Sequence, residues 1–337
     1  MQFVINTARW PLSNLSKIFY LCDKITLVIT RTAVHIHPIN NKISYQKPIF
    51  LIGSCFSDNI GNQFKLHRFN HCANPFGTVY NPISISDQIV TIQGKRELDQ
   101  KKFVFRDDRV YHLDFHSQLF TRSIEEYTHV IDAKAQSTLE YLSQASHVFI
   151  TLGTAWVYIW NETHQSVANC HKLAAHHFTK KLISIDVITG AIQDIITQIQ
   201  LINPYASIIF TVSPVRHLKD GFIENTRSKA RLIEAIHNVT DGQRVHYFPI
   251  FELMIDDLRD YRYYQEDMLH PSNPAIKYIW EQLCSSICDE TTLQLMKMAL
   301  KIETMKMHKP FDDKSSAYQQ HLQKINTLEL EWKKSIN

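Results

Sequence analysis

The chain has 337 residues, which is enough for one large domain or two small ones with a sizeable core. Hydrophobic residues make up 44% and charged residues 20%, a composition typical of a soluble globular protein. The formal net charge of +3 is too small to indicate a nucleic-acid partner, and no stretch approaches the roughly 20 apolar residues that a membrane helix needs.

The start of the chain and its cysteines bear on the compartment. The first 30 residues are rather apolar, but Lys17, Asp23 and Lys24 interrupt them, so we expect no signal peptide. The six cysteines are scattered and form no CxxC pair, which argues against a disulfide framework or a structural zinc site. We therefore expect a protein of the reducing cytoplasm that uses no metal and no cofactor.

The predicted elements alternate between strands and helices. A short apolar run at 49–52 predicts a strand that ends at Gly53, and Ile60 and Phe64, four apart, indicate a helix after it. A second apolar run at 148–152 ends at a glycine as well. The later elements are a helix, a strand, a helix, a strand and a helix, over 184–203, 207–212, 227–239, 245–251 and from 273 onward.

This alternation predicts a parallel sheet covered by helices on both faces. Ligands of such sheets bind beyond the carboxyl ends of the strands, so the residues that follow each strand are the candidate site. The last part, 291–337, has a different pattern, from which we expect helices packed on the outside of the core, away from the cleft.

Ser54 and Cys55 follow the first strand, at the point where a helix begins. A thiol at a helix N-terminus is expected to have a lowered pKa, whereas a hydroxyl there needs an external base. The alternative is that Ser54 caps the helix and Cys55 is a small buried apolar residue. Both residues stay candidates for a nucleophile.

Asp267 and His270 lie three residues apart in the loop before the last core helix. A histidine that accepts a proton from a nucleophile needs a carboxylate to orient its other ring nitrogen, and this segment supplies both groups. An ordinary loop at the entry of a helix, with a surface carboxylate, is the alternative.

These blocks occur with others in a fixed order along the chain. The segments are 53–57, 74–77, 81–82, 151–156, 169–172, 211–217, 257–262 and 267–272, with a further stretch at 308–311. Together they resemble the GSCFA family, which is named for its N-terminal motif and is similar to a branch of the SGNH/GDSL hydrolases. The resemblance implies a three-layer, flavodoxin-like α/β fold with a C-terminal helical extension. We accordingly divide the chain into an extension of uncertain status, the GSCFA domain and a helical appendage, over 1–31, 32–290 and 291–337.

The same resemblance implies site residues. SGNH hydrolases begin with a Gly-Asp-Ser block whose serine is the nucleophile, and this block places Cys55 at the attacking position and Ser54 at that of the aspartate. Their oxyanion hole uses the nucleophile's N–H, a glycine after the second strand and an asparagine. Gly77 matches the glycine, whereas the block that contains Thr154 lacks the asparagine. The candidate substitutes are Asn74 and Asn169.

We expect a hydrolase or acyltransferase that acts on an ester, with an acylated carbohydrate or another small molecule as substrate and with no nucleic-acid or membrane partner. Arg216, which follows the third strand, is a candidate for binding an anionic or polyhydroxyl substrate, and a structural salt bridge is its alternative. The rival function is a non-catalytic module that binds a carbohydrate or a protein. The missing asparagine favours the rival, whereas the joint presence of Cys55, Asp267 and His270 favours the enzyme.

Overall fold

The computed structural model describes residues 32–308 and 310–336. The chain divides into two units, 1–32 and 33–337, and the fold described below is that of the second. The predicted extension at 1–31 lies outside the described residues.

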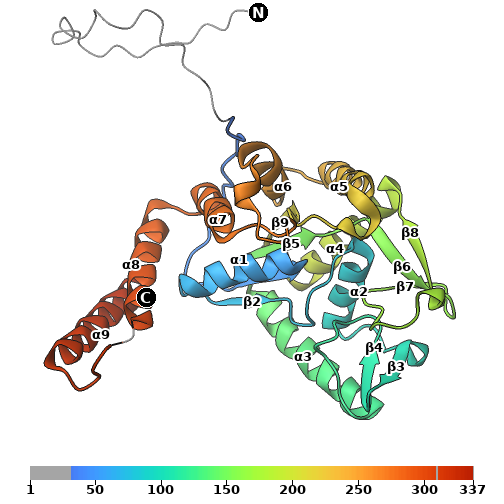
Figure 1. Cartoon of the computed structure of the whole chain (residues 1–337), viewed down its shortest axis with the longest axis horizontal. Helices are drawn as coiled ribbons and strands as arrows, with labels where there is room; N and C mark the ends of the chain where they lie inside the picture. The colour runs from blue at the N-terminus through green and yellow to red at the C-terminus, as the bar shows by residue number, and fades with distance from the viewer. Residues whose placement is uncertain (1–31, 309, 337) are drawn as a thin grey trace, which may run out of the picture. The chain divides into compact units, whose positions relative to one another are not determined.

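A parallel sheet of five strands forms the centre of this unit (Figure 1). Its spatial order is β10-β9-β5-β1-β2, and every neighbouring pair is parallel. The bounds of the strands are Ile49–Gly53 for β1, His71–Ala73 for β2, His147–Leu152 for β5, Ser207–Val212 for β9 and Val245–Tyr247 for β10. Numbered along the chain within this sheet, the order is 2-1-3-4-5, which is the flavodoxin-like arrangement. The fold class predicted from the sequence is therefore confirmed.

Successive residues of the strands enter opposite faces of the sheet, and both faces are apolar. In β1, Phe50 and Ile52 pack into one core, whereas Ile49 and Leu51 pack into the other. In β5, Ile150 packs into the first core and Phe149 into the second. Burial on both faces explains why these strands are continuous apolar runs in the sequence.

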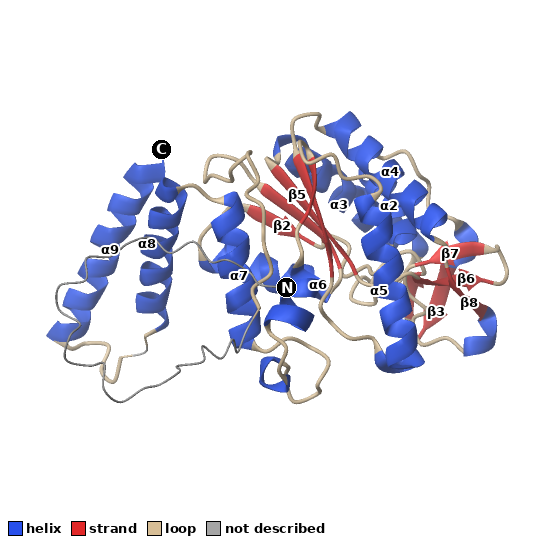
Figure 2. Ribbon diagram, turned by 90° about the horizontal axis from the view of Figure 1, so that it is seen from above, coloured by secondary structure: helices blue, strands red, loops and turns tan. Residues whose placement is uncertain are grey.

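Helices cover both faces, as Figure 2 shows. The apolar residues of α2 (Pro82–Ile92), α3 (Ile124–Gln144), α4 (Ile185–Ile202) and α5 (Gly221–His237) belong to the first core. Those of α1 (Cys55–Leu66) and α7 (Asn273–Ile287) belong to the second, as does Ile250 of the short helix α6 (Ile250–Glu252). By length and composition α4 could cross a membrane, but Ile188, Ile192, Ile195 and Ile199 on its inner face are fully buried in the core.

Smaller elements complete the domain. A hairpin joins β3 (Phe103–Arg106) to β4 (Arg109–His112), and a three-stranded antiparallel sheet contains β6 (Trp156–Trp160), β7 (Gln165–Val167) and β8 (Phe178–Leu182). Short 3₁₀ turns span Gln100–Lys102, Ala175–His177, Leu218–Asp220 and Tyr261–Tyr263, and one π turn spans Leu253–Asp257.

Two predicted boundaries were wrong. The strand expected over 245–251 ends at Tyr247, because Pro249 has no N–H to continue the ladder and a helical turn begins at Ile250. The helix expected over 227–239 begins six residues earlier, at Gly221, and ends at His237.

The C-terminal extension is helical, as predicted. Helices α8 (Glu290–Met307) and α9 (Ser316–Ile336) pack on each other around Ala299, Ile302 and Trp332. In both views this pair lies at the end of the unit opposite the β6–β8 sheet (Figures 1 and 2).

Candidate active site

The turn between β1 and α1 requires glycine at its first position. Gly53 has φ +140°, and a Cβ atom there would lie 2.2 Å from the carbonyl oxygen of Thr151 on β5. Its N–H donates to Asn74 Oδ1 over 2.8 Å. The close approach of β1 to β5 is what lets the chain turn directly into α1 at the carboxyl edge of the sheet.

The two candidate nucleophiles in this turn point in different directions. Ser54 is fully buried, and its Oγ caps α1 by accepting the N–H of Phe56 over 3.3 Å. Cys55, the first residue of α1, is half-buried and lines a cleft. Of the two side chains, Cys55 is the one that faces the cleft.

Asp267 and His270 form a tight pair in the loop before α7. His270 Nδ1 lies 2.6 Å from Asp267 Oδ2, while Asp267 Oδ1 accepts the N–H groups of His270 and Leu269 over 3.0 and 2.8 Å. These bonds, first the backbone N–H of His270, then that of Leu269 and then the imidazole, lower the pKa of Asp267 to about 2. The charged carboxylate therefore fixes the ring so that Nε2 is left for another partner.

Arg216 holds this loop in place. Its backbone N–H donates to the carbonyl of Leu269 and its guanidinium to that of Met268, each over 3.1 Å. Among the described residues it makes no ion pair, so the salt bridge named above as an alternative does not form. Because Arg216 follows β9, these contacts bring the His270 loop to the carboxyl edge of the sheet.

Cys55 and His270 line the same cleft, whose volume is about 370 Å³. It lies beyond β1 and β5, where the order of the strands reverses and where sheets of this kind bind ligands. Within the described chain the thiol makes no hydrogen bond to His270; such bonds often tighten only when substrate binds. The lining residues are Cys55, Tyr80, Asn81, Thr154, Trp156, Tyr158, Val167, Ala168, Lys180, Val215, Arg216, His217, Leu218, Lys219, Asp220, Leu269 and His270.

The expectation of a lowered pKa for Cys55 was wrong. Burial, followed by the carboxylate of Asp58, raises the pKa of the Cys55 thiol above its usual value. The N–H groups of Cys55 and Phe56 and the charge of Lys229 act in the opposite direction but do not compensate. The position at the helix N-terminus was visible in the sequence, whereas the burial of the thiol and the nearness of a carboxylate one turn along the helix were not.

Lys229, on α5, is a buried cation that the sequence did not reveal. Its side chain is 1% exposed, and Nζ donates to the carbonyl oxygens of Gly153 and Ser213 over 2.7 and 2.8 Å. Burial lowers the pKa of Lys229 to about 7, and the Cys55 thiolate opposes that shift. Lys229 thus ties together the ends of β5 and β9 and places a titratable amine near the thiol.

The structure gives most of the expected oxyanion donors other partners. The Gly77 N–H donates to the carbonyl of Asn74, and Asn74 Nδ2 donates to Asp58 Oδ1 over 2.7 Å. Thr154 lines the cleft, but its N–H donates to the carbonyl of Tyr80. Asn169 accepts the N–H of His171 and does not line the cleft. Gly77, Asn74 and Asn169 therefore support the surrounding loops.

Two other groups are better placed to stabilise an oxyanion. Cys55 opens α1, so its N–H has no partner within the helix. Tyr80 lines the cleft, and burial raises the pKa of its hydroxyl, with smaller contributions from Cys55 and Asp58, so that it stays a donor. In the sequence, Tyr80 directly precedes the Asn81-Pro82 motif, which was the one signal that could have found it.

His217 is a second cleft histidine that the sequence analysis did not select as a candidate. Burial, followed by the charges of Lys229 and His270, lowers the pKa of His217 to about 4. Its Nε2 is buried and has no hydrogen-bond partner among the described residues. A neutral imidazole in this position offers one more polar group to a bound molecule.

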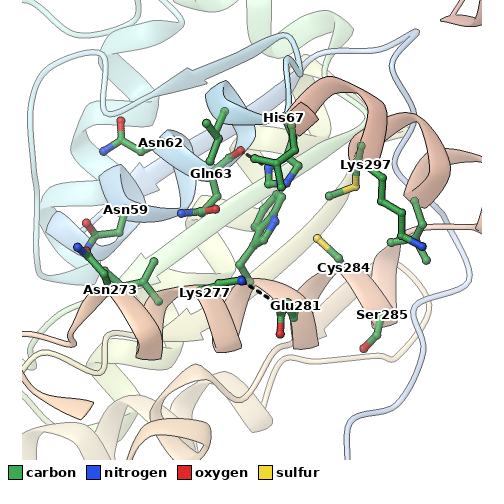
Figure 3. A pocket seen from close by; sticks show the side chains of 16 residues that line it. Asn59, Asn62, Gln63, His67, Asn273, Lys277, Glu281, Cys284, Ser285 and Lys297 are labelled. Carbon is green, nitrogen blue, oxygen red and sulfur yellow. Dashed lines mark hydrogen bonds and ion pairs between the residues drawn. The ribbon is translucent and has the colours of Figure 1, made fainter. Parts of the chain in front are cut away.

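A larger cavity, of about 790 Å³, lies elsewhere, between α1, α7 and α8 (Figure 3). Its lining is mostly apolar and includes Trp280 and aliphatic side chains of the three helices. Cys55 and His270 do not belong to it. We place the candidate site in the smaller cleft because the reactive groups are there. In the described ranges, no group of three or more His, Cys, Asp or Glu side chains could hold a metal ion.

Fold and site together define a three-layer α/β protein with a cysteine and a His–Asp pair in a cleft at the carboxyl edge of its sheet. The chain belongs to the GSCFA family, whose sequence profile matches residues 48–283. A search of curated proteins found no match.

Several solved structures are distantly similar. A carbohydrate esterase of family 3 from Talaromyces cellulolyticus is 8% identical, with a TM-score of 0.35, over 75% of this chain and 99% of the esterase. An acetyl xylan esterase from the rumen bacterium Butyrivibrio proteoclasticus is 13% identical, with a TM-score of 0.38, over 72% and 64%. A family two carbohydrate esterase from Clostridium thermocellum is 13% identical, with a TM-score of 0.36, over 73% and 64%. Likenesses this remote carry no argument about activity.

Proposed function

We propose that the protein is an ester hydrolase or acyltransferase in which Cys55 is the nucleophile. The observation that carries this proposal is that the half-buried thiol of Cys55 and the ring of His270, which Asp267 orients over 2.6 Å, line one cleft. A nucleophile, a base and a residue that orients the base are the three parts that acyl transfer requires.

The raised pKa of Cys55 gives His270 its role. The thiol is largely protonated at neutral pH, so His270 takes its proton as Sγ attacks the ester carbonyl carbon. The Cys55 N–H and the Tyr80 hydroxyl bind the oxyanion that forms. The C–O bond then breaks, His270 returns the proton to the leaving alcohol oxygen, and an acyl thioester stays on Cys55. Water or a second alcohol, deprotonated by His270, attacks the thioester and releases the acid or a new ester.

An acylated carbohydrate is the substrate class that we propose, in a reducing compartment such as the cytoplasm, where the thiol is kept free. The five cysteines in the described part of the chain are all unpaired, as this chemistry requires. We propose no nucleic-acid partner and no membrane partner.

The test is turnover and trapping on a panel of acetyl and longer acyl esters, beginning with 4-nitrophenyl acetate. We expect release of the alcohol and a transient acyl adduct on Cys55, identified by mass spectrometry after rapid acid quenching. Cys55→Ala should show neither, whereas Cys170→Ala, a half-buried cysteine outside the cleft lining, should show both.

The rival is a module that binds a carbohydrate without turnover. The specific observations in its favour are that Gly77 and Asn74 are committed to other partners and that the thiol makes no bond to His270 in the described chain. Binding of sugar ligands without any adduct on Cys55, for every ester of the panel, would select this rival.

A further inference from the structure

The cleft that contains Cys55 and His270 carries an excess of positive charge. Three basic side chains line it, those of Lys180, Arg216 and Lys219, and Asp220 is the one carboxylate among the described residues that do so. Because a cleft with low-dielectric walls concentrates the field of its charges, this imbalance favours a negatively charged ligand.

Lys180 and Lys219 both lie close to the ring of Tyr158, with Nζ 5.4 and 5.5 Å from its centroid. Lys180 is paired with Asp220, which compensates its charge. Lys219 instead donates to the hydroxyl of Tyr158 over 3.1 Å, and its side chain is exposed. An exposed ammonium whose bond goes to a hydroxyl keeps most of its charge and two of its three N–H donors for a ligand.

Of the basic side chains that line the cleft, Arg216 is the second, after Lys219, that has no carboxylate partner in the described chain. Its guanidinium lies against the rings of Phe222 and Tyr264, at 4.2 and 5.3 Å from their centroids, and donates one bond to the carbonyl of Met268. A guanidinium in contact with two rings has restricted freedom and is pre-organised for an anion, and a single bond to a carbonyl leaves most of its five N–H groups for a ligand.

The β6–β8 sheet adds an aromatic surface next to these cations. Trp156 and Tyr158 are two residues apart on β6, so they share one face, and both line the cleft. Lys180 on β8 lies opposite Tyr158 in the register, with Nζ 4.9 Å from the Trp156 ring centroid. Flat apolar side chains beside a few polar groups suit a ring-shaped ligand.

We propose that the alcohol portion of the substrate is a sugar ring bearing an anionic group, a carboxylate or a phosphate, with the ring against Trp156 and Tyr158 and the anion bound by Lys219 and Arg216. That an ester of this sugar is the substrate of the reaction rests on the proposed function. The binding of the anionic sugar to the cleft does not depend on that function, so binding and turnover are measured separately.

Binding is tested on the full chain with the Cys55→Ala substitution, which prevents turnover. The probes are methyl glucuronoside, glucose 6-phosphate and the uncharged methyl glucoside, titrated by NMR. Charge-assisted hydrogen bonds predict that at least one anionic probe binds about tenfold or more tighter than methyl glucoside, and that added salt reduces the ratio. The tighter of the two anionic probes identifies the group as a carboxylate or a phosphate.

Substitutions of Lys219 test whether its positive charge is responsible for the preference for anionic probes. Lys219→Met should bring the ratio of anionic to neutral affinity down by about tenfold, and Lys219→Arg should retain it. Lys181→Met is the matched control, because Lys181 neighbours Lys180 on β8 but is exposed and does not line the cleft. It should leave the ratio unchanged.

Equal binding of the neutral and both anionic probes would overturn the inference, as would equal effects of Lys219→Met and Lys181→Met. O-acetylated forms of the same three sugars then test turnover by the unsubstituted chain. If the anionic probes bind but no acetyl ester is cleaved, the inference stands and the proposed function falls. If the neutral ester is cleaved as well as both anionic esters, the proposed function stands and the inference falls.

Discussion

At the scale of single residues, the turn at Gly53 decides which side chain faces the cleft. A one-residue difference separates Ser54, which caps α1 from a fully buried position, from Cys55, which faces the cleft. The Gly-Asp-Ser block of SGNH hydrolases places the nucleophile at the third position, and here that position is the one at the cleft.

The first prediction follows from these opposite orientations. Cys55→Ala should abolish turnover, because Cys55 is the residue of the turn that lines the cleft. Ser54→Ala should reduce turnover only severalfold, because the loss of a helix cap costs about 1 kcal/mol and loosens the turn without removing the thiol. Steady-state kinetics on the best ester of the panel provides the measurement. Full activity in Cys55→Ala with none in Ser54→Ala would assign the nucleophile to Ser54.

The second prediction concerns the charges around the thiol. The carboxylate of Asp58 raises the pKa of Cys55 and the ammonium of Lys229 lowers it, so their removal should shift the pKa in opposite directions. We expect iodoacetamide to label Cys55 faster at pH 7 in Asp58→Asn and more slowly in Lys229→Met, by about tenfold for each unit of pKa. The pH at half-maximal labelling gives both shifts.

The Lys229 variant needs a check on folding, because it leaves two buried carbonyls without a donor. Circular dichroism shows whether it folds, and Asp58→Asn tests the electrostatic argument without this risk. Since Cys55 and Lys229 influence each other, their titrations belong to the pair. Shifts of the same sign in both variants would contradict the assignment.

At the scale of elements, the strands and helices of the central sheet could be predicted because burial leaves a mark on the sequence. Three of the four predicted strands, β1, β5 and β9, are apolar on both faces, and Ile188, Ile192, Ile195 and Ile199 mark α4 by their spacing. β2 has only three half-buried residues and leaves no such mark. β8 has polar and charged residues at its centre and alternates half-buried with exposed positions, so no apolar run signals it. β6 is itself a short apolar run, Trp156–Trp160, and the sequence prediction missed it.

The site could be predicted only in part, for a related physical reason. Cys55, Asp267 and His270 follow elements whose ends meet at the carboxyl edge of the sheet, so topology brings them together. Tertiary packing brings Tyr80 to the cleft and Lys229 to the ends of β5 and β9. A lysine in the middle of a helix has no sequence pattern that distinguishes it from a surface residue, and for Tyr80 the one signal is its position directly before the Asn81-Pro82 motif.

The third prediction compares alanine substitutions at two glycines, one with open space around it and one in close contact with a neighbouring strand. Gly190 lies inside α4, and a Cβ atom there would meet nothing within 4 Å, so Gly190→Ala should stabilise the protein by about 0.5–1 kcal/mol. Gly53→Ala should destabilise it by more than about 4 kcal/mol, because its Cβ would overlap the Thr151 carbonyl and its φ suits glycine. Urea unfolding measures both, and a similar effect of the two substitutions would refute the strand-to-helix turn described here.

At the scale of the whole molecule, the 2-1-3-4-5 strand order explains the location of the candidate site. The order reverses between β1 and β5, so the loops after these strands diverge and leave a cleft. The turn at Gly53 enters this cleft from β1, the β6–β8 sheet forms one wall, and Arg216 anchors the loop of His270 to the end of β9. The α8–α9 pair contributes no residue to the lining of the cleft. The helical extension therefore packs away from the cleft, which is formed by the loops at the sheet edge and the β6–β8 sheet.

The last prediction concerns the stability of the whole domain in acid. Burial is the first cause that lowers the pKa of His112, His147 and His217 to about 4 each, whereas an unfolded histidine titrates near 6.5. Between about pH 4 and 6.5 the unfolded chain therefore binds protons that the folded domain does not. The contribution of these histidines to the free energy of unfolding should be fully present above pH 6.5. As the pH is lowered from there, the free energy of unfolding should fall by up to about 1.4 kcal/mol per pH unit for each histidine.

His147 isolates one of these contributions. It is fully buried in β5, with Nε2 3.0 Å from the carbonyl of Asn41 and Nδ1 3.0 Å from Ser146 Oγ. Urea unfolding at pH 7, 6 and 5 should show a smaller loss of stability in His147→Gln than in the unsubstituted chain, by up to about 1.4 kcal/mol per pH unit, even if the variant is less stable at pH 7. Ser146→Ala is the control, because it removes one partner of the ring and leaves the histidine, so the steeper pH dependence should persist. A pH dependence that is the same in all three proteins would show that His147 is protonated equally in the folded and unfolded states, and would contradict its burial as a neutral ring.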